Sequence, residues 1–97
     1  MANVSFLSLA EQDYQEALTW YQARNTQAAA GFEAAIEVAV QRICDTPEMS
    51  PLCDERHRYY VLRRYPYSII YRLVSGDVLV VAVAHARRSP TFWQDRV

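Results

Sequence analysis

The stretch that decides the fold is Tyr67-Ser-Ile-Ile-Tyr-Arg-Leu-Val74, Ser75-Gly-Asp77, Val78-Leu-Val-Val-Ala-Val-Ala84. Its first part carries strand-forming residues, and its last part is an unbroken apolar run with valine at four of seven positions. Two such runs joined by a short turn that contains glycine predict a β-hairpin. A strand that is apolar on both faces is usually central in its sheet and covered on both sides.

Two further strand candidates lie outside this hairpin. The period-two pattern begins upstream at Arg58 and predicts a strand from Arg58 to Arg64, followed by a tight turn at Tyr65-Pro66. Residues 3–7 alternate weakly and predict a short first strand. The tail from Ser89 contains a proline and is expected to hold one short helical turn.

Two helices are predicted between the first strand and the second. Apolar residues recur at helical spacing from about Leu9 to Arg24, and the run Ser8-Leu-Ala-Glu11 predicts a capping box at the start of this helix. Asn25 or Thr26 is expected to cap a second helix, which Pro47 ends. Its apolar stripe follows steps of three and four: Ala29, Phe32, Ile36, Ala39 and Ile43.

These elements predict an α+β fold in the order β-α-α-β-β-β. The connection between the two helices is so short that they must form an antiparallel hairpin, which packs on a twisted, mostly antiparallel sheet. The 97 residues leave no room for a second core, so residues 1–97 are expected to form a single domain.

The bulk properties narrow the protein class further. No apolar run is long enough for a transmembrane helix and no signal peptide is visible, so we expect a cytoplasmic protein without a membrane partner. Cys44 is then expected as a core thiol and Cys53 as a loop thiol. Two cysteines nine residues apart do not make a zinc site, and no motif predicts a metal or another cofactor.

The formal net charge of −1 hides a separation between the two parts of the chain. Residues 1–55 hold nine acids and two arginines, whereas residues 56–97 hold eight arginines and two acids. The basic residues are all arginine, with no lysine. Arginine binds phosphate and carboxylate in a bidentate manner, so the second part predicts a surface that binds an anion or a protein partner.

The residues near the end of the last strand are the candidates for chemistry. Metal-free RNA cleavage needs a base, an acid and cations, and His85 and Arg87 could supply two of these roles. A carboxylate base could come from the irregular segment before the second strand, at Glu48, Asp54 or Glu55. Strand alternation would place Arg63 and Arg64 on opposite faces of the sheet. Tyrosines interleave with these arginines and are expected mainly to pack across strands: Tyr59, Tyr60, Tyr65, Tyr67 and Tyr71.

The second part of the chain resembles a known family. The run Arg63-Arg-Tyr-Pro-Tyr67, the turn at Gly76-Asp77 and the run His85-Ala-Arg-Arg-Ser-Pro90 before Phe92-Trp93 are similar to the C-terminal half of RelE/ParE toxins. The two predicted helices and the terminating proline also fit that family. The resemblance implies the β-α-α-β-β-β fold and the toxin role in a bacterial type II toxin–antitoxin system, also known for plasmid stabilisation.

The resemblance implies a cognate antitoxin partner and leaves two targets open. ParE-like members inhibit DNA gyrase and are not nucleases, whereas RelE-like members cut mRNA on the ribosome. The chain has Phe92 where many nuclease members have a tyrosine, and it has no lysine, which favours the ParE-like interpretation. The residues expected to contact the target are Arg63, Arg64, Arg87, Arg88, Phe92 and Trp93.

The sequence is therefore compatible with three alternatives. The first is a ParE-like gyrase inhibitor, and the second is an mRNA endonuclease that uses His85, Arg87 and Glu55. The third is an inactive toxin-like interaction module. The sequence also leaves open a homodimer or a heterotetramer with the antitoxin, whose amphipathic segment we expect to lie along the alanine-rich helices.

Overall fold

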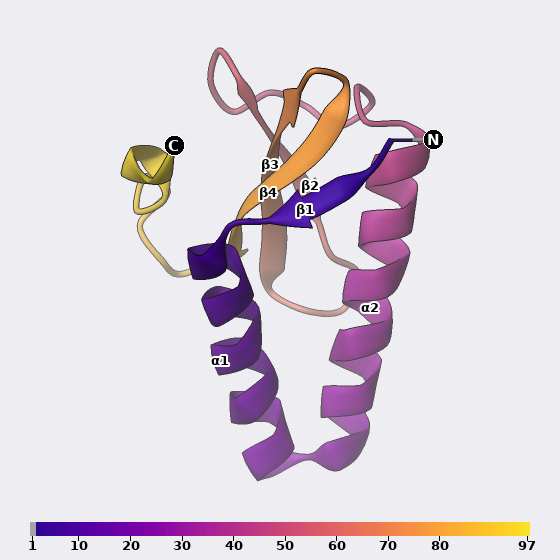
Figure 1. The fold of residues 1–97 in the computed structure, drawn as a ribbon. Helices are drawn as coiled ribbons and strands as arrows, with labels where there is room; N and C mark the ends of the chain where they lie inside the picture. Colours follow the sequence, from indigo (N-terminus) through magenta and orange to yellow (C-terminus); the bar gives the residue numbers. More distant parts are fainter. Residues whose placement is uncertain (1) are drawn as a thin grey trace.

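The computed structural model describes residues 2–97, and its elements follow the predicted order (Figure 1). Strand β1 (Val4–Phe6) leads into helix α1 (Ser8–Arg24), and helix α2 (Thr26–Asp45) runs back beside it. Strands β2 (His57–Val61), β3 (Tyr67–Val74) and β4 (Asp77–His85) follow, and a 3-10 turn spans Gln94–Arg96. The α+β fold with a helical hairpin is confirmed.

The four strands form one sheet in the order β1-β4-β3-β2. Strand β3 is antiparallel to both of its neighbours, and β1 is parallel to β4, so the sheet is mostly antiparallel as predicted. The β3–β4 turn contains Ser75 (φ 53°) and Gly76 (φ 84°). Positive φ at two successive turn residues gives the twist that suits a tight hairpin. The central position of β4 is confirmed.

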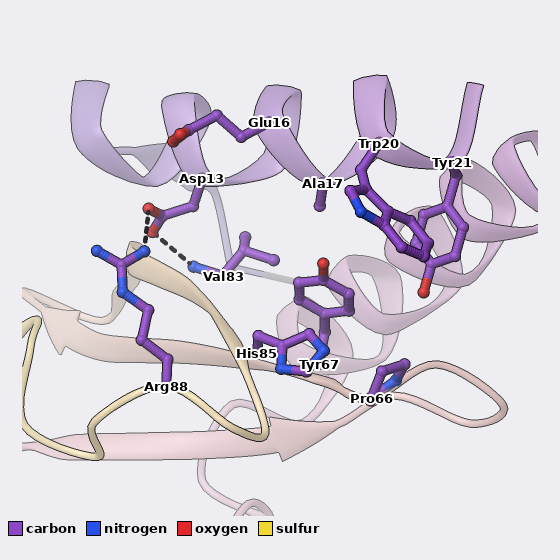
Figure 2. A pocket seen from close by; sticks show the side chains of 10 residues that line it. All are labelled: Asp13, Glu16, Ala17, Trp20, Tyr21, Pro66, Tyr67, Val83, His85 and Arg88. Carbon is purple, nitrogen blue, oxygen red and sulfur yellow. Dashed lines mark hydrogen bonds and ion pairs between the residues drawn. The ribbon is translucent and has the colours of Figure 1, made fainter. Parts of the chain in front are cut away.

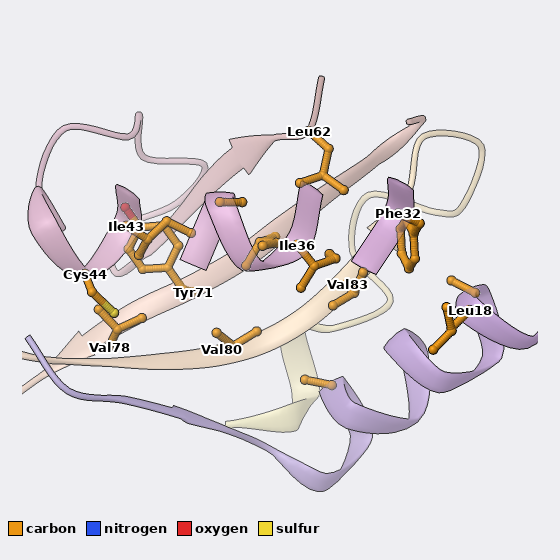
Figure 3. Packing of buried hydrophobic residues seen from close by; sticks show 14 of the residues in the cluster. Leu18, Phe32, Ile36, Ile43, Cys44, Leu62, Tyr71, Val78, Val80 and Val83 are labelled. Atoms are coloured by element: carbon orange, nitrogen blue, oxygen red, sulfur yellow. The ribbon is translucent and has the colours of Figure 1, made fainter. Parts of the chain in front are cut away.

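Both helices pack on one face of the sheet and enclose the main core (Figure 3). The predicted stripe of α2 is buried along its whole length. At one end of the core Ile43 and Cys44 lie near Tyr71 and Val78, and at the other Phe32 lies near Val83. Within residues 2–97, neither helix is long and apolar enough to cross a membrane.

The C-terminal tail covers the opposite face of the sheet. A second apolar cluster joins Trp93 to Ile70, Val81 and Ala82. The β3–β4 register shifts between Ile70 and Tyr71, whose partners are Ala82 and Val80, so Val81 is the extra residue of a β-bulge. The tail therefore provides the second cover that an apolar central strand needs.

Two local expectations are wrong. Helix α1 begins at Ser8, with Leu7 as its N-cap, so no side chain caps it and the predicted capping box is absent. The Leu7 amide instead donates to the Val80 carbonyl. This hydrogen bond continues the pairing of β1 with β4 up to the residue that precedes the helix. Strand β2 ends at Val61 rather than at Arg64, because Arg64 has a left-handed backbone (φ 70°) that an extended strand excludes.

Asn25 is the side chain that caps α2, and its removal gives a testable effect. Its Oδ1 accepts a hydrogen bond from the Ala28 amide at 3.0 Å. We expect Asn25→Ala to lower the free energy of unfolding by about 1 kcal/mol, measured by urea denaturation. Ser8→Ala is the matched control and should change it by less than about 0.5 kcal/mol, because Ser8 is exposed and is not the cap of α1. Equal losses in the two variants would contradict this assignment.

Candidate functional site

Two arginine pairs lie at the same end of the sheet. Arg63 and Arg64 belong to the β2–β3 loop, and Arg87 and Arg88 follow β4. The two segments are joined by a hydrogen bond of 2.8 Å from the Ala86 amide to the Pro66 carbonyl. All four arginines are exposed. We call this set of four the arginine rim.

The β2–β3 loop is held in a strained shape beside α2. Arg64 has a left-handed backbone, which costs a residue other than glycine about 1 kcal/mol. Tyr65 anchors the loop because its hydroxyl donates to the Ala28 carbonyl at 2.9 Å. Gly31 makes room for this hydroxyl, since a Cβ at position 31 would clash with it. Both arginines leave the strand and line one groove, so the expectation that alternation separates them is wrong.

His85 ends β4 directly opposite Tyr67 on β3. Its Nδ1 accepts a hydrogen bond from the Arg87 amide at 3.0 Å, so the neutral ring carries its proton on Nε2. The ring meets Tyr67 edge to face, with 5.0 Å between the ring centroids. Figure 2 shows both rings beneath α1, in a pocket that Arg88 also lines.

Glu55 does not join His85. Glu55 precedes β2, whose first residue, His57, pairs with Arg72 on β3, whereas His85 pairs with Tyr67 at the other end of the same strand. Tyr67 and Arg72 are five residues apart along β3, a distance of about 16 Å. The catalytic set that the sequence suggested is therefore not assembled around one point.

The two aromatic residues of the tail have different environments. The Phe92 ring faces the guanidinium carbons of Arg88 at 3.8 Å and Arg96 at 5.0 Å. Trp93 is 4% exposed and packs on the His57 ring, with centroids 4.7 Å apart. The expectation that Trp93 contacts a target is thus corrected, because its indole is part of the sheet's second apolar cluster.

His57 is a buried histidine with a structural setting. Its Nδ1 lies 2.9 Å from Asp54 Oδ2, and Asp54 Oδ1 also accepts hydrogen bonds from the amides of Arg56 and His57. Burial alone would raise the pKa of Asp54, but these hydrogen bonds and the His57 ring outweigh it and hold the pKa below its ordinary value. The pair fixes the loop that leads into β2. No three His, Cys, Asp or Glu side chains within residues 2–97 are placed to hold a metal ion.

Sequence reasoning missed the role of Asp13. This carboxylate is buried, accepts from the Val83 amide at 3.1 Å and binds the guanidinium of Arg96 at 2.6 and 3.2 Å. Arg96 also donates to the Val81 carbonyl at 3.1 Å. Strand β1 pairs with β4 only as far as Val80. The ion pair therefore supplies hydrogen-bond partners for the next free β4 backbone groups, the Val81 carbonyl and the Val83 amide. The available signal was the position of Asp13 between Ala10 and Ala17, on the apolar face of the helix.

These features define a class: a small α+β domain whose sheet is covered on both faces and ends in an exposed cationic rim. A family model described as "ParE toxin of type II toxin-antitoxin system, parDE" matches residues 4–90. The chain belongs to this ParE toxin family. Comparison with curated proteins finds no match.

A solved structure supports the fold independently. It is described as "Chromosomal ParDE TA system from P. aeruginosa" and matches with a TM-score of 0.77. The match covers 90% of this chain and 98% of the other, at 15% sequence identity. At that identity the likeness concerns the fold.

Proposed function

We propose that the protein is the toxin of a cytoplasmic toxin–antitoxin pair, that it inhibits DNA gyrase by binding, and that a cognate antitoxin neutralises it. The observation that carries the proposal is the arginine rim on a member of the ParE family. Its four arginines are exposed at one end of the sheet. Guanidinium groups in that setting bind carboxylate or phosphate groups of a large partner.

The arrangement around the rim favours binding over RNA cleavage. Glu55 lies at the far end of β3 from His85, so it is not placed to work as a base with that histidine. Phe92 has no hydroxyl that could transfer a proton, and the chain has no lysine. A binding inhibitor needs none of these groups.

Arg64→Gly tests whether the arginine rim binds the target, because it removes one rim charge without lowering the stability of the protein. Glycine accepts the left-handed backbone, so the variant should unfold at the same urea concentration as the parent protein or at a higher one. Loss of one charge-assisted contact, worth about 1.5–3 kcal/mol, should raise the toxin concentration for half-inhibition of supercoiling by about 10- to 100-fold. The measurement is a supercoiling assay with purified gyrase.

Arg56→Gln provides the control for this assay, because Arg56 is an exposed arginine outside the rim. It should inhibit as the parent protein does. Normal supercoiling at a large excess of parent toxin would refute gyrase inhibition. Cleavage of mRNA on translating ribosomes, lost in His85→Ala, would support the nuclease alternative instead.

The antitoxin is proposed to dock on a groove between α2 and the β2–β3 loop. The groove is a hollow of about 400 Å³ whose lining combines apolar side chains with Arg42, Arg63 and Arg64 and contains no carboxylate. None of these arginines forms an ion pair with another residue of 2–97. Val38, which also lines the groove, is 51% exposed. An acidic, amphipathic segment complements this surface in both shape and charge.

This placement also accounts for neutralisation. Arg63 and Arg64 belong both to the groove and to the arginine rim. A segment bound in the groove therefore covers half of the rim, and the toxin cannot present these arginines to gyrase at the same time.

A further inference from the structure

A second pocket lies beside α1, where the start of β3 and the end of β4 face this helix (Figure 2). It measures about 360 Å³ and opens to solvent. It is distinct from the groove beside α2 because the two share no lining residue. Four of its side chains are aromatic: Trp20, Tyr21, Tyr67 and His85.

Trp20 is held at the mouth of this pocket without being buried. It is 51% exposed, so the hydrophobic core does not explain its position. The Arg24 guanidinium carbon lies 4.0 Å from the centre of its ring and an Arg24 nitrogen donates to the Trp20 carbonyl at 3.0 Å. Tyr21 meets its ring edge to face at 5.1 Å. A large exposed ring fixed in this way is suited to stack on a flat ligand.

The pocket also offers polar groups without partners. The hydroxyls of Tyr21 and Tyr67 form no hydrogen bond to another residue of 2–97, and Figure 2 shows the Tyr67 hydroxyl directed at α1. Burial is the largest cause that raises the pKa of each tyrosine, so both hydroxyls stay neutral donors. The Nε2 proton of His85 adds a further donor.

The charges around the pocket are balanced. Asp13 pairs with Arg96 at 2.6 Å and lies 3.8 Å from Arg88, and Glu16 is the second carboxylate of the lining. With Arg96 included, two carboxylates and two guanidinium groups sum to zero around the pocket, which favours a neutral flat ring over a free cation or a free anion. Beyond the pocket, Arg87 is exposed and forms no ion pair within residues 2–97.

We propose that this pocket binds a nucleotide, either free or at the end of a nucleic acid strand. The base stacks on Trp20 and receives hydrogen bonds from Tyr67 and His85. The phosphate group extends to Arg87 and Arg88, which bind it by charge-assisted hydrogen bonds.

The protein contains two tryptophans, which makes the test specific. In a ¹H–¹⁵N spectrum of the full chain, the indole signal of Trp20 should shift saturably on addition of AMP, GMP, CMP or UMP, while that of buried Trp93 stays in place. By calorimetry, Trp20→Ala should weaken binding at least about tenfold, which is the loss expected for one stacked base. Leu9→Ala, at another exposed apolar residue of α1, is the control and should bind as the parent protein does.

Comparison of AMP with related compounds shows which parts of the ligand the pocket recognises. Arg87→Ala should weaken binding of AMP and leave binding of adenosine unchanged. Tighter binding of a 5′-phosphorylated dinucleotide than of AMP supports a strand end, and equal binding supports a free nucleotide. Three results would overturn the proposal: no saturable shift of the Trp20 signal with any nucleotide, equal binding of ribose 5-phosphate and AMP, or binding of arginine methyl ester in preference to AMP.

Discussion

Arg96→Met is expected to lower the free energy of unfolding by about 3–5 kcal/mol, the range measured when one partner of a buried ion pair is removed. The Arg96 and Asp13 side chains are only 10% and 5% exposed and are joined by two hydrogen bonds. Methionine fills similar space but removes both hydrogen bonds to the buried carboxylate, which keeps only the half-exposed Arg88 nearby at 3.8 Å. A domain of this size has a stability of only about 5–15 kcal/mol, so the loss is a large fraction of the total. Urea denaturation followed by circular dichroism measures it.

Arg88→Met is the matched control for this substitution. Arg88 approaches the same carboxylate at 3.8 Å but its side chain is 49% exposed, so its removal should cost about 1 kcal/mol or less. The double variant Asp13→Leu with Arg96→Met should recover part of the stability, because it removes the unpaired buried charge. If Arg96→Met cost no more than Arg88→Met, the pair would not hold the tail to the sheet.

The contrast between α2 and the tail shows what could be predicted from the sequence. The stripe from Ala29 to Ile43 repeats over about four turns, and each residue in it is buried. The β3–β4 hairpin was likewise predictable, because its strands and its turn are encoded within nineteen adjacent residues, 67–85. The periodicity of apolar residues predicts which side chains are buried wherever one face of a helix or strand packs against the core.

The remaining features depend on contacts between distant residues. Asp13 and Arg96 are 83 positions apart, and no local pattern pairs them. The bulge at Val81 arises from the register between two strands rather than from the composition of either one. Trp93 is buried because the tail folds back over the sheet, although its neighbours in sequence suggest an exposed segment. The separation of Glu55 from His85 also follows only from the strand order.

The acidic part and the arginine-rich part of the chain form different layers of the fold. The acidic part forms the two helices, and the arginine-rich part forms three strands and the tail. Arg42 is an exception, since it lies on α2 and faces the groove beside Arg63 and Arg64. Three arginines from two distant segments thus meet at one apolar groove, which is the arrangement that an acidic partner segment would select.

A substitution at Arg42 tests how the antitoxin neutralises the toxin, because it leaves the arginine rim unchanged. Arg42→Glu combined with Val38→Asp places two negative charges in the groove and changes no residue of the arginine rim. We expect binding of the antitoxin, taken as the small protein encoded by the adjacent reading frame, to weaken about a thousandfold, or about 4 kcal/mol. Calorimetry measures the affinity, and the supercoiling assay should show inhibition that the antitoxin no longer relieves.

The control for this variant changes charge outside the groove. Arg56→Glu alters an exposed arginine that does not line the groove, and it should bind the antitoxin as the parent protein does. A doubly substituted toxin that still inhibits gyrase but resists the antitoxin would establish the groove as the docking surface. Full neutralisation of that variant would place the antitoxin elsewhere, while the rim would remain the surface for gyrase, since the two surfaces share only Arg63 and Arg64 and neither is altered.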